Sequence, residues 1–206
     1  MITTIKFIGI PGCGKSTLID KLKETNADIT VTKEELYTTH DLSELNLNPW
    51  QNATPFQEKM IETMAQKEQQ TRDDELTLNV EHTPIEMIEF FSAAYKLSGF
   101  ISDYGFECIR NKFRRIKKPH NCGYVYILCP PYASMRNMKI RNRDGEGAIQ
   151  PFVLDTINHL IVAHYDSNLS PSKLLLHYRE DDFHVKEVQE FLRQCAFERP
   201  CYCTEH

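Results

Sequence analysis

The sequence predicts an α/β fold in which helices cover both faces of a five-stranded parallel sheet. Short apolar runs alternate with longer amphipathic segments along the 206 residues, and this alternation is typical of parallel strands joined by crossover helices. The first apolar run, 2–10, leads directly into a glycine-rich stretch and then into a helical pattern. The length fits one domain over residues 1–206, because no internal repeat or composition shift divides the chain.

Local patterns place the elements of the N-terminal half. Apolar, β-branched runs predict strands, and apolar residues at helical spacing predict helices. The second helix is expected to start at Thr54-Pro55, because proline is favoured in the first helical turn. The expected elements are strands at 2–10, 29–32 and 76–80 and helices at 15–25 and 54–70.

The C-terminal half continues the alternation. One plain apolar strand is closed by Pro130-Pro131, and the basic helix after it is ended by the glycine-rich break at 144–147. The expected elements are helices at 85–97, 101–116, 134–143, 151–166 and 185–195 and strands at 124–128 and 174–178.

Residues 9–16, GIPGCGKS, match the pattern G-x-x-x-x-G-K-[ST] between the first strand and the first helix. Glycines let the backbone wrap closely around a phosphate, since no Cβ blocks the approach. Backbone N–H groups and the helix N-terminus then face the anion. Lys15 is expected to reach the β- and γ-phosphates, and the Ser16 hydroxyl to bind Mg²⁺. The sequence therefore predicts a nucleoside-triphosphate site in a phosphate loop at 9–17.

The composition limits the classes of partner. The formal net charge of −5 argues against a broad nucleic-acid-binding surface. No apolar stretch is long enough to cross a membrane, and the first strand begins too early for a signal peptide, so we expect a cytoplasmic protein. The seven cysteines are an odd number, and Cys13 lies within the phosphate loop, which favours reduced thiols over a disulfide framework.

Six segments occur in a fixed order, and these are the phosphate loop, Lys33-Glu34-Glu35, Pro55-Phe56-Gln57, Glu81-His82-Thr83, 141–146 and 178–183. Together they resemble the deoxynucleoside kinase family, which phosphorylates the 5′-hydroxyl of deoxynucleosides. The resemblance spans nearly the whole chain and implies a P-loop kinase fold with an arginine-rich lid at about 136–148. The short length and divergent motifs indicate a viral or otherwise distant member, which, if viral, would act in the host cytoplasm.

The resemblance implies the catalytic groups. Glu34 stands nineteen residues after Lys15, at the end of the second strand, where the family places the general base for the 5′-hydroxyl. Glu35 remains a competitor, because a one-residue shift exchanges the two carboxylates. Arg141 and Arg143 match the lid arginines that neutralise charge on the transferring phosphoryl group.

The resemblance also implies the residues of the donor site. Mg²⁺ is expected between Ser16 and Glu81, the acidic residue after the third strand. Arg179 and Asp181 lie in the segment that in the family wraps the adenine. The expected ATP-binding residues are Gly9, Pro11, Gly12, Cys13, Gly14, Lys15, Ser16, Thr17, Arg179 and Asp181.

Five residues are expected to contact the nucleoside. Gln57 matches the glutamine that pairs with the base, and its carboxamide offers both a donor and an acceptor. Met64 and Met87 stand where purine- and cytidine-preferring members place charged residues, so the wall is apolar and adaptable and favours pyrimidines, thymidine above all. Glu146 matches the residue that accepts a hydrogen bond from the sugar 3′-hydroxyl, and His82 replaces an arginine beside the reacting oxygen.

Other departures motivate alternative functions. Asn46 replaces a sugar-binding tyrosine, and Asn137 replaces one lid arginine. A degenerate kinase fold that only binds nucleotides or partner proteins is therefore one alternative to a deoxynucleoside kinase that converts ATP and a deoxynucleoside to ADP and the 5′-monophosphate. A nucleoside monophosphate kinase is another, since basic residues at 110–115 could hold an acceptor phosphate.

The resemblance implies a homodimer formed by helices of the middle region. The apolar residues that could form such an interface could equally form one core-facing stripe. They are Met87, Phe90, Phe91, Phe100 and Ile101.

Overall fold

The computed structural model describes residues 4–25, 30–32, 45, 48–68, 77–79, 84–116, 122–142, 149–170, 172–180 and 183–197. Its elements are, in order, β1 (Thr4–Gly9), α1 (Lys15–Thr25), β2 (Thr30–Thr32), α3 (Pro49–Glu68), β3 (Thr77–Asn79), α4 (Pro84–Glu86), the π-helical turn η2 (Met87–Ser92), α5 (Ala93–Leu97), α6 (Asp103–Phe113), β4 (Cys122–Leu128), α7 (Pro131–Arg141), α8 (Pro151–Ser167), β5 (Lys173–His177) and α9 (Val185–Phe197).

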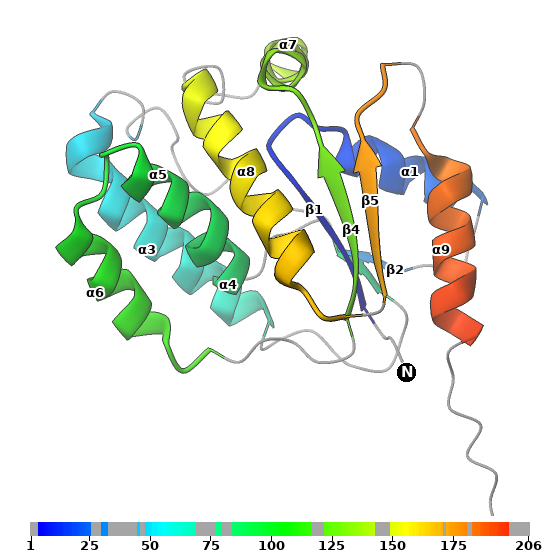
Figure 1. Ribbon diagram of the computed structural model, residues 1–206, viewed down its shortest axis with the longest axis horizontal. Helices are drawn as coiled ribbons and strands as arrows, with labels where there is room; N and C mark the ends of the chain where they lie inside the picture. The colour runs from blue at the N-terminus through cyan, green and yellow to red at the C-terminus, as the bar shows by residue number, and fades with distance from the viewer. Residues whose placement is uncertain are drawn as a thin grey trace, which may run out of the picture.

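One parallel sheet organises these elements (Figure 1). The order of its strands is β2–β3–β1–β4–β5. The longer strands β1, β4 and β5 lie together, whereas β2 and β3 have three residues each. The pairing of β1 with β4 runs from Thr4 opposite Cys122 to Gly9 opposite Ile127. The predicted α/β class is therefore confirmed.

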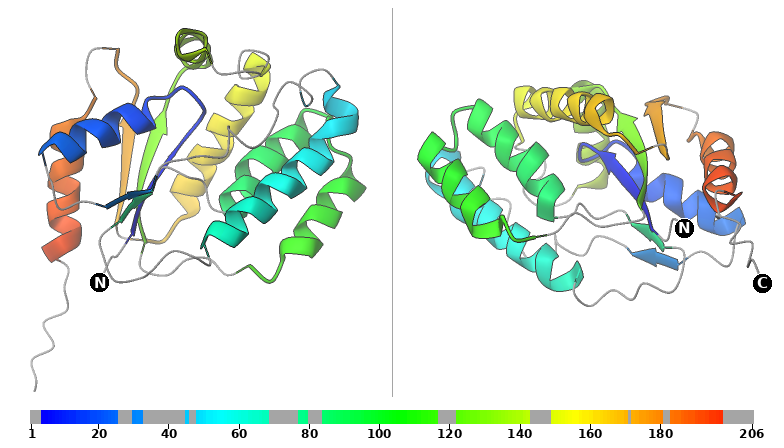
Figure 2. Two further views of the ribbon diagram at one scale, coloured as in Figure 1. Left: turned by 180° about the vertical axis from the view of Figure 1, so that it is seen from behind. Right: turned by 60° about the horizontal axis from the view of Figure 1, so that its bottom comes forward.

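The order of the strands creates a binding position at the end of β1. The chain leaves β1 toward β3 and β2, and it later returns on the other side of β1 as β4 and β5. Right-handed crossovers that run in opposite directions lie on opposite faces of a sheet. In agreement, α1 packs against β1 and α9, whereas α8 packs against β1 and β4 (Figure 2). Open α/β sheets bind ligands where the strand order reverses, which here is the carboxyl end of β1.

The central strands are apolar because helices cover both of their faces. Ile5, Phe7 and Ile8 in β1 and Val125 and Tyr126 in β4 are all fully buried. Such a largely apolar composition, interrupted in β1 only by the buried Lys6, is typical of the middle of a parallel sheet. The core extends outward from the sheet through α8 to η2 and α5, then to α3 and finally to α6.

Helix α3 begins earlier than the sequence predicts. The expected start at Thr54-Pro55 is wrong, because the helix already begins at Pro49 and continues through Pro55. The carbonyl of Asn48 accepts a hydrogen bond from the N–H of Asn52 at 3.0 Å, which closes the first turn. Pro55 cannot donate a backbone hydrogen bond, but it lies on the exposed side of the helix, where water can take that place.

The helix expected at 85–97 contains a π-helical turn. The segments α4, η2 and α5 form one continuous helix, since Glu86 and Ala93 on either side of η2 keep right-handed helical angles. Apolar periodicity does not reveal such a turn, so the sequence could not place it. The remaining elements begin and end within three residues of their expected positions.

Tyr95 in α5 makes the stability of the fold sensitive to alkaline pH. Burial raises the pKa of Tyr95 to about 12, whereas a tyrosine in the unfolded chain ionises near its ordinary pKa of about 10. As the pH rises, Tyr95 therefore loses its proton in the unfolded chain before it does so in the folded protein. The contribution of Tyr95 to stability is lost as the pH rises from about 10 to about 12. This group should lower the free energy of unfolding by about 2–3 kcal/mol over that interval.

Denaturant unfolding at about pH 9 and about pH 12 tests this prediction. The loss of stability at the higher pH should be smaller in Tyr95→Phe than in the wild type. Tyr132→Phe changes an exposed tyrosine in α7 and should behave like the wild type. Equal losses in the wild type and Tyr95→Phe would contradict the prediction.

Candidate active site

The phosphate loop joins β1 to α1 and bends at two glycines. Gly12 and Gly14 have φ angles of 73° and 95°, in the left-handed region that residues with a Cβ rarely adopt. The N–H of Leu18 bonds to the carbonyl of Gly14 at 2.9 Å, so α1 begins directly from the loop. No acidic residue lies in the first turn of α1. The loop amides and the N-terminus of α1 therefore form a cradle for an anion.

Lys15 is folded into this loop. Its ammonium group donates hydrogen bonds to the carbonyl of Gly9 at 2.7 Å and to the carbonyl of Ile10 at 3.2 Å. The Sγ of Cys13 lies 3.7 Å from the same nitrogen, and the side chain is only 8% exposed. The positive charge is therefore held beside the backbone amides that would meet a phosphate, a position in which it attracts anions.

Helix α7 holds the loop from the side. The buried Ser134 hydroxyl donates a hydrogen bond to the carbonyl of Pro11 at 2.5 Å, and Asn137 Nδ2 donates to the carbonyl of Gly12 at 2.9 Å. A Cβ at position 12 would lie 2.6 Å from the carbonyl oxygen of Ser134. The close approach of the helix therefore depends on a residue without a side chain at position 12.

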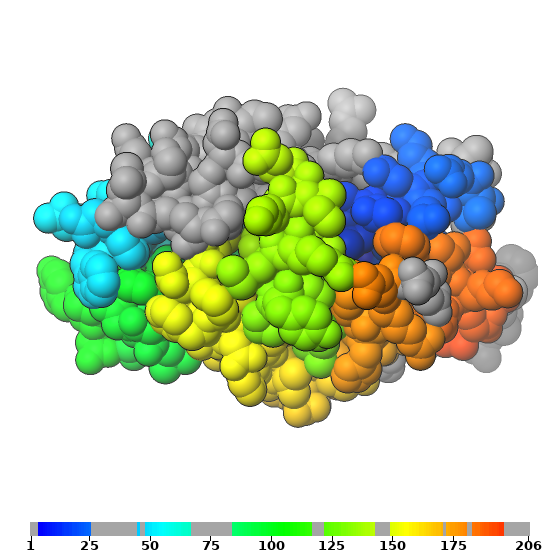
Figure 3. All heavy atoms as spheres, turned by 90° about the horizontal axis from the view of Figure 1, so that it is seen from above, coloured from blue at the N-terminus to red at the C-terminus, as the bar shows by residue number. Residues whose placement is uncertain are grey.

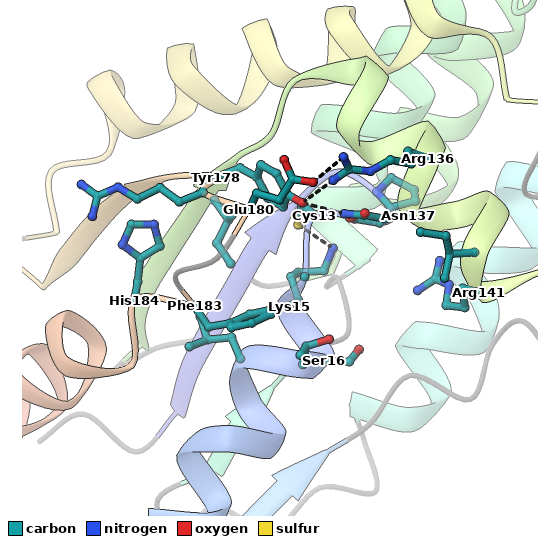
Figure 4. Close-up of a pocket in the computed structure, with 18 residues that line it drawn as sticks. Cys13, Lys15, Ser16, Arg136, Asn137, Arg141, Tyr178, Glu180, Phe183 and His184 are labelled. Carbon is teal, nitrogen blue, oxygen red and sulfur yellow. Dashed lines mark hydrogen bonds and ion pairs between the residues drawn. The ribbon is translucent and has the colours of Figure 1, made fainter.

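The segment after β5 forms the opposite wall. The N–H of Tyr178 bonds to the carbonyl of Leu128 at 2.8 Å, which fixes this segment to the end of β4. Arg136 on α7 donates hydrogen bonds to Glu180 at 2.6 Å and to the Tyr178 hydroxyl at 3.2 Å. Asn137 also donates to that hydroxyl, at 3.3 Å. Figure 4 shows these side chains pointing toward one another above Lys15.

A cavity of about 480 Å³ lies between the loop, α7 and the segment after β5. A volume of this size is typical of a small-molecule site. Figure 3 views this edge of the molecule from above. Helix α7 is green, the loop and α1 beside it are blue, and the segment after β5 is orange. The lining includes residues 11–18, Ile127, Arg136, Asn137, Ile140, Arg141, Tyr178, Arg179, Glu180, Phe183 and His184.

Two buried cysteines belong to this region, one within the loop and one just after β4. These are Cys13 and Cys129. Burial, and to a smaller extent the neighbouring Cys13, raise the pKa of the Cys129 thiol to about 12. Cys129 therefore remains a neutral thiol at physiological pH, which suits packing rather than nucleophilic chemistry.

The cavity brings together most of the residues that the sequence assigned to ATP. Gly9 lies behind it, where Cys13 Sγ and the carbonyl of Ile127 leave no room for a Cβ. Asp181 and Arg143 lie outside the described residues. The residues that line the cavity are Pro11, Gly12, Cys13, Gly14, Lys15, Ser16, Thr17, Arg141 and Arg179.

Sequence reasoning missed the binding partners of α7. Tyr178 and Glu180 were recognised only as part of a motif, and Asn137 only as a replaced arginine. Their contacts join positions more than 40 residues apart, and no local pattern in the sequence reports such a contact.

The predicted base-binding residues lie in a different part of the molecule. Gln57 and Met64 on α3 and Met87 in η2 are at most 4% exposed, and none of them lines the described cavity. The Ser92 hydroxyl donates a hydrogen bond to Gln57 Oε1 at 3.3 Å. The structure thus packs the three residues into the contact between α3 and η2. The predicted residues Glu34, Glu35, Asn46, His82 and Glu146 lie outside the described residues.

The described residues contain one predicted metal ligand. Ser16 is exposed at the start of α1 and lines the cavity, so its hydroxyl oxygen is free to face a cation in a manner suited to Mg²⁺. Glu81 lies outside the described residues. Among the residues that the structure does describe, no cluster of three or more His, Cys, Asp or Glu could hold a metal ion.

The middle helices do not expose the apolar residues considered for a dimer interface. The five side chains are Met87, Phe90, Phe91, Phe100 and Ile101. Each of them is at most 9% exposed and belongs to the hydrophobic core. They form a core-facing stripe. Within the described ranges, none of the helices has the length and apolar character that crossing a bilayer requires.

Comparison with known proteins decides the family. The family model of the deoxynucleoside kinases matches residues 5–195. The chain belongs to the deoxynucleoside kinase family. One relative in sequence is "Putative kinase protein 029R" of Invertebrate iridescent virus 3, which is 25% identical over 159 residues, or 77% of this chain and 80% of that protein. The prediction of a divergent, virus-related kinase of this family is therefore confirmed.

Solved structures share the fold of this chain. Deoxyadenosine kinase from M. mycoides with bound dATP superimposes with a TM-score of 0.77 at 14% identity, over 92% of this chain and 99% of that chain. The same enzyme with bound dCTP gives a TM-score of 0.76 at 13% identity, over 93% and 99%. At this level of identity the likeness shows the kinase fold alone.

Replacement of Gly12 should separate the loop from α7. Gly12→Ala places a Cβ against the Ser134 carbonyl, in addition to its unfavourable positive φ. We expect the free energy of unfolding to fall by about 2–4 kcal/mol, as measured by denaturant titration.

Gly99→Ala is the matched control, because Gly99 has a similar φ of 79° but no atom within 4 Å of the added Cβ. Its loss should be about 1–2 kcal/mol, from the backbone alone. If both variants lost the same stability, the close contact with α7 would have no energetic role.

Proposed function

We propose that this protein transfers the γ-phosphate of ATP to the 5′-hydroxyl of a deoxynucleoside, with a preference for pyrimidines such as thymidine. The observation that carries this proposal is the donor cavity, which Lys15 and the phosphate loop line in a member of the deoxynucleoside kinase family. In this proposal, residues 1–206 form one kinase domain.

On the donor side, the chain would bind the phosphates and stabilise their charge. Loop amides and Lys15 would hold the β- and γ-phosphates. Arg141, in the last turn of α7, lines the same cavity and would act with Arg143 as an arginine-rich lid at about 136–148. Ser16 and Glu81 would hold Mg²⁺, which when bound neutralises charge between the β- and γ-phosphates.

On the acceptor side, one carboxylate would take the proton of the 5′-hydroxyl. We assign this role to Glu34, with Glu35 as its competitor, because both follow β2 in sequence and ligands of α/β folds bind at the carboxyl ends of the strands. Glu146 would accept a hydrogen bond from the sugar 3′-hydroxyl, and His82 would lie beside the reacting oxygen.

Base recognition would fall to the contact between α3 and η2. The Gln57 carboxamide would pair with the base, between the thioethers of Met64 and Met87. A serine hydroxyl can donate to Oε1 or accept from Nε2, so Ser92 can support either orientation of the Gln57 amide. Thymine and cytosine present opposite donor and acceptor patterns. Because Ser92 can support both orientations of the amide, Gln57 could pair with either base.

A monophosphate kinase is less well supported. The basic residues considered for an acceptor phosphate lie on or just after α6, which Figure 1 shows beyond α3, at the far side from the phosphate loop. One of them, Arg110, pairs with Glu107 on the same helix at 2.9 Å. None of Arg110, Arg114 and Arg115 lines the described cavity.

Phosphate transfer to each deoxynucleoside tests the reaction and the choice of base. Deoxyadenosine and deoxycytidine belong in the panel beside thymidine, since the structural neighbour is a deoxyadenosine kinase that also binds dCTP. Glu34→Gln should lower kcat by about 100-fold or more while ATP binding persists, because only the base is removed. If instead Glu35→Gln loses activity and Glu34→Gln does not, the two roles are exchanged.

No monophosphate from any nucleoside, from a wild-type protein that binds ATP, would overturn the transfer proposal in favour of a nucleotide-binding protein. Product in the wild type that persists in both glutamine variants would overturn the carboxylate mechanism.

Gln57→Leu tests base recognition. The leucine keeps the approximate volume but removes both hydrogen-bonding atoms, so kcat/KM for nucleosides should fall by about 10- to 100-fold. The KM for ATP should stay unchanged, because Gln57 does not line the donor cavity. Gln66→Leu, on the exposed side of the same helix, is the control. Equal kcat/KM in Gln57→Leu and the control would exclude Gln57 from the acceptor site.

A further inference from the structure

The Tyr178 hydroxyl has an unusual hydrogen-bonding position in the donor cavity. It accepts two hydrogen bonds, one from Asn137 at 3.3 Å and one from Arg136 at 3.2 Å. A phenol has two acceptor positions and one proton to donate. Both acceptor positions are therefore used, and the proton is the part of the hydroxyl left to bind a partner. Within the described part of the chain, no residue is found to accept that proton.

The hydroxyl lies close to the phosphate loop. Asn137 donates from the same nitrogen to the carbonyl of Gly12 at 2.9 Å, so the phenol is two hydrogen bonds away from the loop backbone. The backbone N–H of Tyr178 is fixed to Leu128, and its ring packs against the hydrophobic core. Figure 4 shows the ring reaching across the cavity toward Asn137, above Lys15. The proton is thus presented at the phosphate end of the cavity by a side chain that is held in place.

The charges around the hydroxyl favour an anionic acceptor. Lys15 and Arg141 line the same cavity. Arg136 donates directly to the phenol oxygen, and Glu180, 2.6 Å from Arg136, offsets part of its charge. An O–H group that already accepts from a cation is a good donor to an anion, and hydrogen bonds to charged oxygens are stronger than those to neutral ones. A phosphate oxygen fits this environment better than the neutral atoms of a base.

We propose that the Tyr178 hydroxyl donates a hydrogen bond to a phosphate oxygen of the donor nucleotide, and that Asn137 and Arg136 position it to do so. This rests on the proposed function, in which the cavity binds the donor triphosphate. Tyr178 is then a nucleotide-binding residue. Asn137 and Arg136 are positioning residues that act through the phenol.

Direct binding of Mg²⁺·ATP and Mg²⁺·UTP, measured by titration calorimetry, tests the contact. The two nucleotides share their phosphates and differ in their bases, so a contact with phosphate predicts the same loss for both. Tyr178→Phe should bind each about tenfold more weakly, the expected loss for one hydrogen bond to a charged group. Tyr132→Phe removes the hydroxyl of an exposed tyrosine on α7 outside the cavity and should bind like the wild type.

Each outcome of this titration gives a separate answer. Unchanged affinity in Tyr178→Phe overturns the inference. A loss for ATP that is not matched for UTP also overturns it, because the contact would then be with the base. If the wild type binds neither triphosphate, the proposed donor site itself fails.

The positioning role requires a second comparison. Asn137→Ala should weaken ATP binding in the wild type but should add less than its full factor in the Tyr178→Phe background, since one path of its action has been removed. A double variant whose loss equals the product of the two single losses would show that Asn137 acts independently of Tyr178.

Discussion

The approach of α7 to Gly12 is the constraint on which the rest of the cavity depends. Because position 12 has no side chain, Ser134 and Asn137 can reach the loop carbonyls. Helix α7 starts three residues after β4, which pairs with β1 directly before the loop. The hydrogen bonds therefore join the strand pair, the loop and the helix into one unit. Arg141 lies at the other end of α7, so the same hydrogen bonds that hold α7 against the loop also fix the position of Arg141 relative to Lys15.

The same arrangement explains how distant parts of the chain meet. Since β5 pairs with β4, the chain leaves β5 level with the loop, and the Tyr178 N–H binds Leu128 at that point. The cavity is thus built at the carboxyl ends of three neighbouring strands, β1, β4 and β5. Each strand end contributes a different group, namely the anion cradle, the helix α7 and the tyrosine. Sheet topology, rather than any single motif, determines the set of residues that surround the ligand position.

The sequence predicted features that depend on neighbouring residues and missed those that depend on tertiary contacts. The phosphate loop and α1 are local, and both were placed correctly. Helix α3 was placed too late because Pro49 and Pro55 each suit a first helical turn, and only the packed structure shows that the helix tolerates the second. Likewise, Gln57 was chosen from a local motif, whereas its partner Ser92 is 35 residues away and is presented by a π-helical turn.

A tyrosine and an arginine contribute differently to phosphoryl transfer. The Arg136 guanidinium faces Glu180, and this hydrogen bond holds the pKa of Arg136 above its usual range while offsetting its charge. A neutral phenol donates a directional hydrogen bond but contributes little electrostatic potential. It would therefore bind the ground state and the transition state about equally. Interactions of that kind lower KM rather than raise kcat. Stabilisation of the charge that develops during transfer would then depend on Lys15 and the lid arginines, so that different residues of one cavity govern donor affinity and turnover.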